Sequence, residues 1–502
     1  MHSEYCMRKN ARGAWLALPL VFGLVLAAVT VPAAAQTPVK DTIKIDLGTI
    51  SGTTIGEPGK QVHVYRGIPY AAPPVGDLRW RPPMQPAPWQ GVKQATEYSP
   101  ACAQYYKPDL AKVDPAKISE DCLYLNVNTG AKTTGDRLPV MVWLHEGGLD
   151  TGSANTDVAN SPNLPLHGVV VVTVNHRLGA FSLFANAGLS VESPSGASGN
   201  YGMLDLIAAL QWVRWNIAAF GGDPARVTIF GEGGGGQKVL WLLASPLAKG
   251  LFQRAILESG TSRNYIATQT LSENNTKIDT EWEAYNVSNR FVDRLGARTV
   301  AQMRAKTWQQ IVDAMPAPPA GTEKVPVKDD RMHPAIDAWS LTDHPVNILD
   351  ESIGSDVPVL VGGDADENTM FVGYTADWLP ALSHRKSNLY VYQFTHVPAN
   401  WKKAGLVAPH GMEVRYQFGE LGGKWTPPAG MPADPGLNKD DQTVAENTML
   451  MWVNFAATGD PSVKGIVDWP AFKLVPGQDK YVTIDATPKV ASGFMETFKP
   501  GK

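Results

Sequence analysis

The feature that most constrains the fold is a series of short apolar runs separated by longer amphipathic or irregular segments. They occupy residues 123–127, 139–144, 169–174, 227–230 and 357–361. Because consecutive residues in each run are apolar, both faces of such a strand would be buried, which is typical of a mostly parallel sheet covered by helices. Residues 200–220 carry a broad apolar face and predict a helix. The alternation predicts an α/β fold, with ligands at the carboxyl ends of the strands.

Other segments carry weaker patterns. Residues 42–47 and 61–65 predict strands near the N-terminus, and residues 447–457 and 480–484 predict a late helix and a late strand. Residues 261–345 predict helices inserted above the sheet as a cap.

The first 35 residues predict an export signal. Arg8, Lys9 and Arg12 precede an apolar stretch over residues 15–31, and three alanines at 33–35 supply a cleavage site before Gln36. The apolar stretch is shorter than the roughly 20 residues that a membrane-spanning helix needs, which disfavours a retained anchor. We therefore expect residues 36–502 to form the mature domain, secreted or periplasmic, with no membrane anchor after cleavage.

Charge and motif content exclude several classes of partner. The net charge is −4 and the sequence has no basic stripe, so nucleic acid is not an expected partner. No metal-ligand spacing and no nucleotide-binding motif is present, so no metal or cofactor is expected. Of the three cysteines, Cys6 lies in the signal segment, which leaves Cys102 and Cys122 to form a predicted disulfide in an oxidising compartment.

The sequence VTIFGEGGGG at residues 227–236 reads as a strand, a glycine-rich turn and the start of a helix. Hydrolases of the α/β class carry their nucleophile on such a turn, where small neighbours permit a strained backbone. The spacing is right, but the nucleophile position is Gly233. Taken alone, the turn is equally compatible with a phosphate cradle or a plain tight turn.

Longer motifs resemble the type-B carboxylesterase and cholinesterase family over nearly the whole mature chain. They are YRGIPYA at residues 65–71, SEDCLYLN at 119–126 and NIAAFGGDP at 216–224. The resemblance implies an α/β-hydrolase fold, with a large, mostly parallel central sheet, helices on both faces and an inserted helical cap. It also implies that Cys122 pairs with a cysteine at about the place of Cys102.

The resemblance implies site residues as well. The segment GDADEN at 363–368 resembles that of the family's acidic triad member and indicates Glu367, although Asn368 stands where the family usually has glycine. The segment APHGME at 408–413 indicates His410. The segment WLHEGGL at 143–149 resembles the oxyanion loop, so the oxyanion-hole donors would be the backbone N–H groups of Gly147, Gly148 and Gly234.

Three departures from the family gather at this site. Gly233 replaces serine, Glu146 replaces a glycine, and Lys238 occupies a small-residue position, while Glu232 and Lys238 flank the turn as supporting residues. Because the surrounding motifs are intact, the departures favour a repurposed site over general decay.

Three functions fit these residues. Glu146 and His410, with Lys238 keeping Glu146 ionised, would abstract a proton beside a carbonyl as a lyase or isomerase. Alternatively, His410 would activate a water in a slow carboxylic-ester hydrolase. The third alternative is an inactive ligand-binding or adhesion-type homologue. In each case the expected partner is a small ester or carbonyl compound, aromatic if some of the 15 tryptophans line the gorge. No oligomeric state is predicted.

Overall fold

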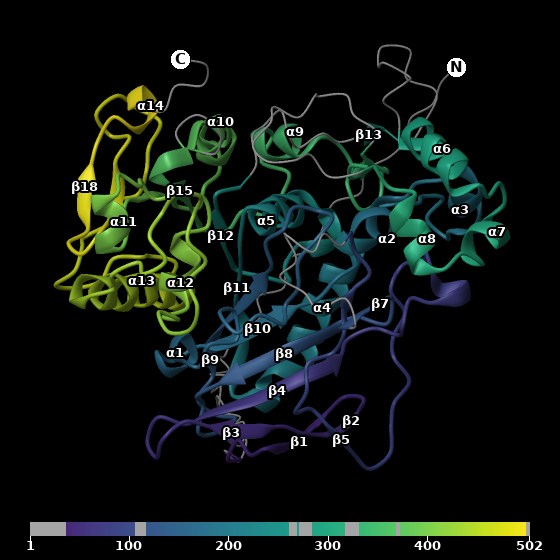
Figure 1. Ribbon diagram of the computed structural model, residues 1–502, viewed down its shortest axis with the longest axis horizontal. Coiled ribbons are helices and arrows are strands. Elements are labelled where there is room, and N and C mark those ends of the chain that lie inside the picture. Colours follow the sequence, from purple (N-terminus) through teal and green to yellow (C-terminus); the bar gives the residue numbers. More distant parts are fainter. Residues whose placement is uncertain are drawn as a thin grey trace, which may run out of the picture. The chain divides into compact units, whose positions relative to one another are not determined.

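A mixed sheet of eleven strands organises the structure (Figure 1). The computed structural model describes residues 37–105, 117–260, 269–270, 284–316, 331–367 and 372–497. The strand order across the sheet is β18 (Lys489–Ala491), β17 (Tyr481–Ile484), β16 (Leu389–Phe394), β15 (Val359–Asp364), β12 (Arg254–Glu258), β11 (Gly222–Glu232), β9 (Leu138–Leu144), β10 (Val170–Val174), β8 (Tyr124–Thr129), β4 (Val62–Pro69) and β3 (Thr53–Ile55).

The strands from β17 to β10 all pair in parallel, and the antiparallel pairs lie towards the two edges. The fold class expected from the sequence is therefore confirmed, although the run at 123–127 lies in an antiparallel strand, β8. Parallel pairing brings the carboxyl ends of β9, β11, β12 and β15 to one edge of the sheet, where the residues that follow each strand meet.

Alternate residues of the central strands enter two different cores. In β9, Val140, Val142 and Leu144 pack in the cluster that includes residues of α4 (Tyr201–Asn216) and α5 (Gly234–Ala244). Met141 and Trp143 point the other way, into the cluster that includes residues of α13 (Lys439–Thr458). This alternation is why both faces of the sheet are covered by helices and why the strands are apolar throughout.

The predicted helices are present, and their ends have local causes. The helix expected over residues 200–220 is α4, followed by a 3₁₀ turn over Ile217–Phe220. The helix expected over 447–457 begins earlier, because Asn438 and Asp441 form a capping box at the start of α13. It ends at Gly459, whose φ of 85° only glycine adopts easily.

The remaining elements surround this framework. A small sheet joins β1 (Thr42–Ile45), β2 (Gly48–Ser51) and β5 (Val92–Gln94). Two short strand pairs are β6 (Ala101–Cys102) with β7 (Ile118–Ser119) and β13 (Gln269–Thr270) with β14 (Ala335–Ile336). Short helices are α1 (Asn163–Leu166), α2 (Gly179–Leu183), α3 (Ala187–Glu192), α10 (Val372–Ser383), α11 (Ala399–Lys403), α12 (Glu413–Gln417) and α14 (Phe494–Thr497).

The region expected to form a cap contains α6 (Ala284–Leu295), α7 (Val300–Arg304), α8 (Trp308–Asp313) and, at its end, α9 (Pro345–Asp350). Figure 1 shows α6, α7 and α8 grouped at one side of the molecule. Much of residues 261–345 lies outside the described residues, so the cap stays a prediction. The signal segment over residues 1–35 also lies outside them.

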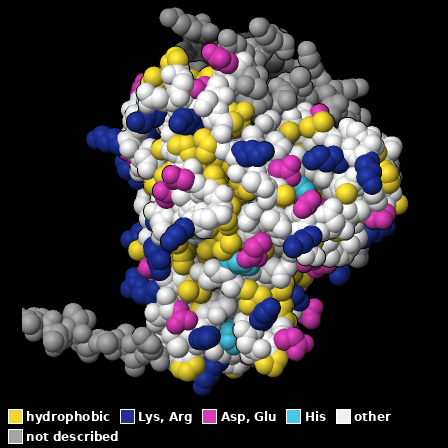
Figure 2. Space-filling model, turned by 90° about the vertical axis from the view of Figure 1, so that its left-hand side faces the viewer, with side chains coloured by type: hydrophobic (Ala, Val, Ile, Leu, Met, Phe, Trp, Pro, Cys, Tyr) yellow, Lys and Arg dark blue, Asp and Glu magenta, His cyan; other side chains and the backbone are white. Residues whose placement is uncertain are grey.

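Two further features bear on the sequence predictions. The predicted disulfide between Cys102 and Cys122 is confirmed, with an S–S distance of 2.03 Å. Among the described residues, no helix combines the length and the apolar character needed to cross a bilayer. On the face drawn in Figure 2, basic and acidic side chains are interspersed.

Candidate active site

The glycine-rich turn forms a sharp elbow between β11 and α5. β11 ends at Glu232 and α5 begins at Gly234, so Gly233 stands alone at the apex with φ 55° and ψ −115°. A side chain raises the energy of this backbone region, whereas glycine enters it freely. The neighbouring glycines are required by close packing, because a Cβ on Gly235 would lie 2.0 Å from the carbonyl oxygen of Leu144.

Gly233 itself faces the predicted histidine. A Cβ added to Gly233 would meet His410 Nε2 at 3.0 Å and Cε1 at 3.2 Å, and no other atom of the described residues outside its chain neighbours lies within 4 Å of it. The apex of the elbow therefore faces the imidazole of His410, as the resemblance to the family implied. The space between them is a short contact distance rather than an open gap.

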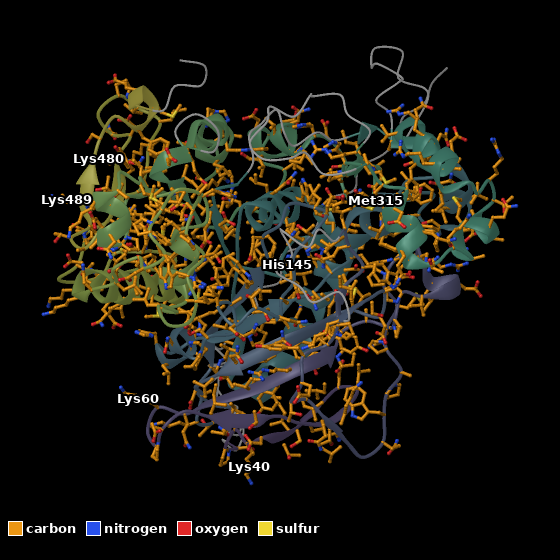
Figure 3. All side chains as sticks on the ribbon, viewed as in Figure 1. Lys40, Lys60, His145, Met315, Lys480 and Lys489 are labelled. Carbon is orange, nitrogen blue, oxygen red and sulfur yellow. A yellow bond between two sulfur atoms is a disulfide. The ribbon has the colours of Figure 1, made fainter. Side chains whose placement is uncertain are left out.

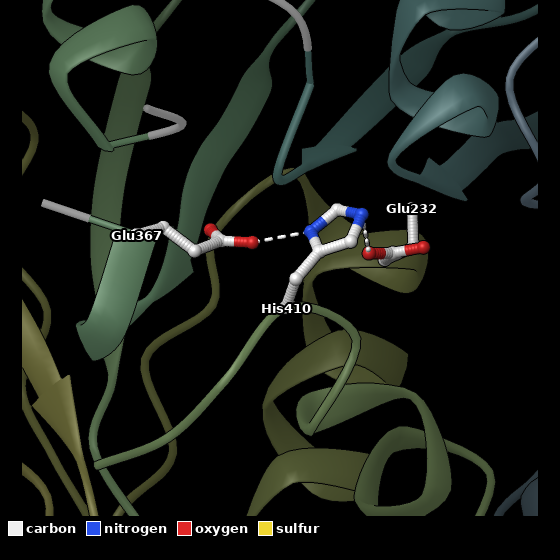
Figure 4. Close-up of side chains that lie close together, drawn as sticks. All are labelled: Glu232, Glu367 and His410. Atoms are coloured by element: carbon white, nitrogen blue, oxygen red, sulfur yellow. Dashed lines mark hydrogen bonds and ion pairs between the residues drawn. The ribbon is translucent and has the colours of Figure 1, made fainter. Parts of the chain in front are cut away.

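His410 and Glu367 come together from separate loops (Figure 4). Glu367 ends a 3₁₀ turn (Ala365–Glu367) directly after β15, and one of its oxygens makes a short hydrogen bond with His410 Nδ1. Its second oxygen accepts from Ser259 Oγ at 2.8 Å and from the N–H of Asp364 at 3.0 Å. Because both oxygens have partners, Glu367 has a fixed orientation and fixes the imidazole ring in turn.

Glu232 occupies the other side of the ring. Its Oε1 atom lies 3.1 Å from His410 Nε2, the nitrogen that would otherwise face the serine of a triad. The side chain of Glu232 is only 3% exposed, whereas that of His410 is 43% exposed. The sequence singled out Glu232 only as a supporting residue, so this contact with the histidine is an addition from the structure.

The two carboxylates change the protonation of the site. Burial lowers the pKa of His410, but the negative charges of Glu232 and Glu367 outweigh it and raise that pKa to about 10. Burial raises the pKa of Glu232 to about 8, helped by neighbouring carboxylates and opposed by His410. At neutral pH His410 is therefore an imidazolium, which can donate a proton, while Glu232 is largely protonated and must lose its proton before it can accept one.

Further buried carboxyl groups surround this pair. Asp364 Oδ2 accepts from the N–H of Met412 at 3.1 Å, and Glu413 accepts from Ser259 Oγ at 3.3 Å. Burial and nearby carboxylates raise the pKa values of Asp364 and Glu413. Neither residue was among the predicted site residues, although Asp364 lies three positions before Glu367 and Glu413 three positions after His410.

The oxyanion loop lies against the elbow. Gly147 and Gly148 have positive φ values of 99° and 65° and are exposed. A Cβ on Gly234 would lie 2.4 Å from the backbone of Gly148, so the two predicted donor positions touch. As the first residue of α5, Gly234 has no carbonyl partner within the helix. This arrangement leaves backbone N–H groups suited to a negatively charged oxygen.

Glu146 and Lys238 lie beside this loop. Glu146 is half-buried, and Lys238 is buried with 1% exposure. Lys238 Nζ donates to the carbonyl oxygen of His145 at 2.9 Å. Burial lowers the pKa of Lys238 to about 7, while the charges of Glu146 and Asp150 act to raise it. The charge of Glu146 thus acts on Lys238, whose side chain bonds the loop backbone; that Lys238 keeps Glu146 ionised stays a prediction.

Glu232, Glu367 and His410 have ligand atoms within 4.8 Å of one another, a spacing compatible with a metal ion. The imidazole ring, however, stands between the two carboxylates and presents a different nitrogen to each. One ion could not bind both carboxylates and a ring nitrogen unless the ring turned. The arrangement fits a proton-transfer site better than a metal site.

Comparisons with known proteins agree with this geometry. The sequence profile of the carboxylesterase family matches residues 39–384 and 374–499. The chain is 33% identical to fumonisin B1 esterase from Sphingopyxis macrogoltabida, over 90% of this chain and 89% of that protein. It is 32% identical to para-nitrobenzyl esterase from Bacillus subtilis (strain 168), over 85% and 91%.

Solved structures give the same result. A PNB esterase structure superposes with a TM-score of 0.72 at 30% identity and covers 90% of this chain and 97% of that one. A thermophilic PNB esterase also gives a TM-score of 0.72, at 29% identity. With the sheet, the elbow and the His410–Glu367 pair in place, the chain belongs to the carboxylesterase family.

Proposed function

We propose that the chain acts on a small ester or other carbonyl compound by general acid–base chemistry, without an acyl-enzyme at residue 233. The observation that supports this most strongly is the 3.1 Å contact between Glu232 Oε1 and His410 Nε2. Covalent acyl transfer needs a hydroxyl or thiol beside the histidine. Gly233 offers none, and a carboxylate takes up the histidine nitrogen that would activate it.

In this proposal each residue has a separate role. The N–H groups of Gly147, Gly148 and Gly234 hold the substrate oxygen as negative charge develops on it. Glu232, once ionised, accepts a proton from the substrate or from water, and His410 donates one. Glu367 orients the imidazole and stabilises its charge. The proton that His410 gives up is replaced by the one that Glu232 receives, across a single short contact.

Two reactions use these parts. Removal of a proton beside the carbonyl would make the chain a lyase or isomerase, and Glu146 at the oxyanion loop is a second candidate for its base. Addition of water to an ester would make it a slow hydrolase. Hydrolysis is favoured by the two relatives, which are named as esterases. The lyase or isomerase reaction is favoured by the charged residues Glu146 and Lys238, which hydrolysis does not need.

Isotopes separate these reactions. Purified protein would be incubated with a panel of small aromatic and aliphatic esters in ¹⁸O-labelled water and, separately, in D₂O. Incorporation of ¹⁸O into the acid product identifies hydrolysis, and deuterium at the carbon beside the carbonyl identifies proton abstraction. The His410→Gln variant serves as the control and should lose either signal. Ligand binding with no isotope signal would refute the proposal and leave a binding protein.

We further propose that the chain is exported and that its mature form begins at Gln36. The signal-like composition of residues 1–35 and the disulfide support this. Mass spectrometry of the N-terminus after expression with the native leader tests it. An intact N-terminus on protein retained with the membrane would contradict it.

A further inference from the structure

Three consecutive carbonyl groups of the oxyanion loop, at residues 145 to 147, are each bonded to another group of the protein. The carbonyl of His145 accepts from Lys238 Nζ at 2.9 Å, and that of Glu146 contacts His145 Nδ1 at 2.8 Å. The carbonyl of Gly147 accepts from the N–H and the hydroxyl of Thr151, at 3.1 and 2.9 Å. In a planar peptide the N–H points opposite to the carbonyl. Holding these three carbonyls therefore directs the N–H group of Glu146 away from Lys238, that of Gly147 away from the His145 ring and that of Gly148 away from Thr151.

Lys238 is the charged member of this set. It comes from α5, the helix that begins at the elbow, and its side chain is fully enclosed. Figure 3 labels His145, the residue it bonds, near the centre of the fold. A buried ammonium is costly unless it is paired and hydrogen-bonded. Burial lowers the pKa of Lys238 to about 7, and both the ammonium and the amine can donate the hydrogen bond to the His145 carbonyl, which gives Lys238 a role beyond packing.

Two neutral histidines lie near Lys238. The rings of His145 and His176 stack with centroids 4.7 Å apart and planes 11° apart. Burial and the nearby charge of Lys238 hold the pKa values of both histidines well below their usual range, so both are neutral. Glu146 and Asp150 are the carboxylates whose charges act on Lys238.

We propose that Lys238 is a positioning residue of the oxyanion hole: its Nζ atom holds the His145 carbonyl and so anchors the start of the loop, whose next two peptides present the N–H groups of Gly147 and Gly148. This inference rests on the proposed function, since it concerns the same site. It differs from the pairing of Lys238 with Glu146 because the contact that matters is with the backbone.

The first test needs no catalysis. Hydrogen–deuterium exchange would be followed in peptides covering residues 145–152 of the wild type, Lys238→Met, Thr151→Val and, as a matched control, the exposed Lys249→Met. Methionine keeps the length of the lysine side chain and removes its charge and its hydrogen bond. We expect exchange in this segment to become about tenfold faster in Lys238→Met and in Thr151→Val, and to be unchanged in Lys249→Met. Unchanged exchange in Lys238→Met overturns the inference, whatever the activity.

The second test separates positioning from folding. In a Gly233→Ser background, with p-nitrophenyl acetate as the probe, Lys238→Met should lower kcat by about 10- to 100-fold and change KM by less than about threefold, since loss of an oxyanion donor costs 10²–10³ in kcat. A proportionate rise in KM with unchanged kcat would overturn the inference. If exchange accelerates as expected but no variant turns over any ester, the proposed function fails and the role of Lys238 in the loop stands. If Lys238→Met does not fold, Lys238→Leu, which also removes the hydrogen bond to the His145 carbonyl, decides through the same two readouts.

Discussion

Glu232 Oε1 lies 3.1 Å from His410 Nε2, on the side of the ring opposite to Glu367. In a serine esterase that nitrogen faces the nucleophile, and the acid and the nucleophile hold the ring between them. Here Glu367 is hydrogen-bonded to one nitrogen of the ring and Glu232 lies at ion-pair distance from the other. The imidazole remains positioned for proton transfer, but its partner is a group that exchanges protons and is poorly suited to attack a carbonyl when protonated.

The first prediction restores the missing hydroxyl. Gly233→Ser should raise p-nitrophenyl acetate turnover by about 10²-fold or more and create a site that reacts with a fluorophosphonate probe, because loss of a triad nucleophile costs about 10⁶ in kcat. The gain will be incomplete, since the new Cβ would lie 3.0 Å from His410 Nε2 and the ring must shift. The positive φ should also reduce stability by about 1–2 kcal/mol.

The wild type is the control for that experiment and should not be labelled. Stoichiometric labelling of the wild type would mean that another serine is the nucleophile, and Ser259 or Ser153 would be the first to test. Ser259 donates to Glu367 Oε2 at 2.8 Å, so it is bound to the acid rather than to the base. Adding Glu146→Gly to Gly233→Ser should raise turnover further, because a carboxylate beside the oxyanion hole opposes the developing charge.

The second prediction concerns the protonation of His410. Glu367→Gln removes a negative charge that contacts Nδ1, so the pKa of His410 should fall from its raised value by more than about one unit. NMR titration of the histidine ring measures it directly, and the exposed Glu446→Gln provides a control that should not move it. An unchanged titration would show that Glu367 does not control the charge of the ring.

The sequence predicted the parts of this site better than their contacts. The resemblance to the family indicated Gly233, Glu367 and His410, and in the structure Gly233 and the turn that holds Glu367 directly follow β11 and β15. That resemblance could not give the direction of the Glu232 side chain, which depends on how the elbow turns. The sequence also could not predict the partner of Lys238, because every residue has a backbone carbonyl and no residue type marks the one that accepts the bond.

Some strands of the fold were predicted from the sequence and others were not. The strands β9, β10 and β11 were predicted from their apolar runs, whereas β12 (Arg254–Glu258) and β16 (Leu389–Phe394) were not singled out. Both contain runs that end in, or are interrupted by, polar side chains. In β12, Glu258 is buried and accepts from Trp452 Nε1 and Gln417 Nε2, each at 2.8 Å. Such partners are distant in sequence, so a buried carboxylate in a strand is not predictable from local pattern.

The third prediction concerns the disulfide. Cys102 and Cys122 are 20 residues apart, and closing a loop of that size should stabilise the fold by about 3 kcal/mol. The Cys102→Ala/Cys122→Ala double variant should therefore unfold at lower urea concentration with a similar slope. Equal unfolding midpoints for the double variant and the oxidised wild type would contradict this.

The fourth prediction is a dependence of stability on pH that comes from His396. Its Nδ1 lies 2.7 Å from Asp485 and its Nε2 lies 3.0 Å from Asp441, and these bonds outweigh burial and raise the pKa of His396. A raised pKa contributes stability below the unfolded value of about 6.5, and that contribution is lost as pH rises through the folded value. The pKa of Asp485 is lowered to about 2, so its contribution is lost only as pH falls towards 2.

The contacts of His396 with Asp485 and Asp441 should therefore stabilise the fold most between about pH 4 and 6.5. His396→Gln should cost about 1–3 kcal/mol in urea unfolding at pH 6, and less at pH 9. His384→Gln is the matched control, because His384 is 58% exposed and its carboxylate partner, Asp350, lies 3.7 Å away. A cost for His396→Gln that is the same at both pH values would show that the ring acts by packing alone.

The last prediction identifies the base. Glu232 touches His410, whereas Glu146 lies half-buried at the oxyanion loop near the charge of Lys238. Each is replaced by glutamine, which keeps shape and removes basicity. We expect Glu232→Gln to lose about 10²–10⁴-fold in turnover of the substrate found by isotope labelling, and Glu146→Gln to lose less than about tenfold, because a general base contributes 10²–10⁴. Ligand binding, measured by calorimetry, should persist in both variants. The reverse order would transfer the base to Glu146 and favour the lyase or isomerase reaction. Full turnover in both variants would mean that neither carboxylate takes the proton, and the acid–base proposal would fail.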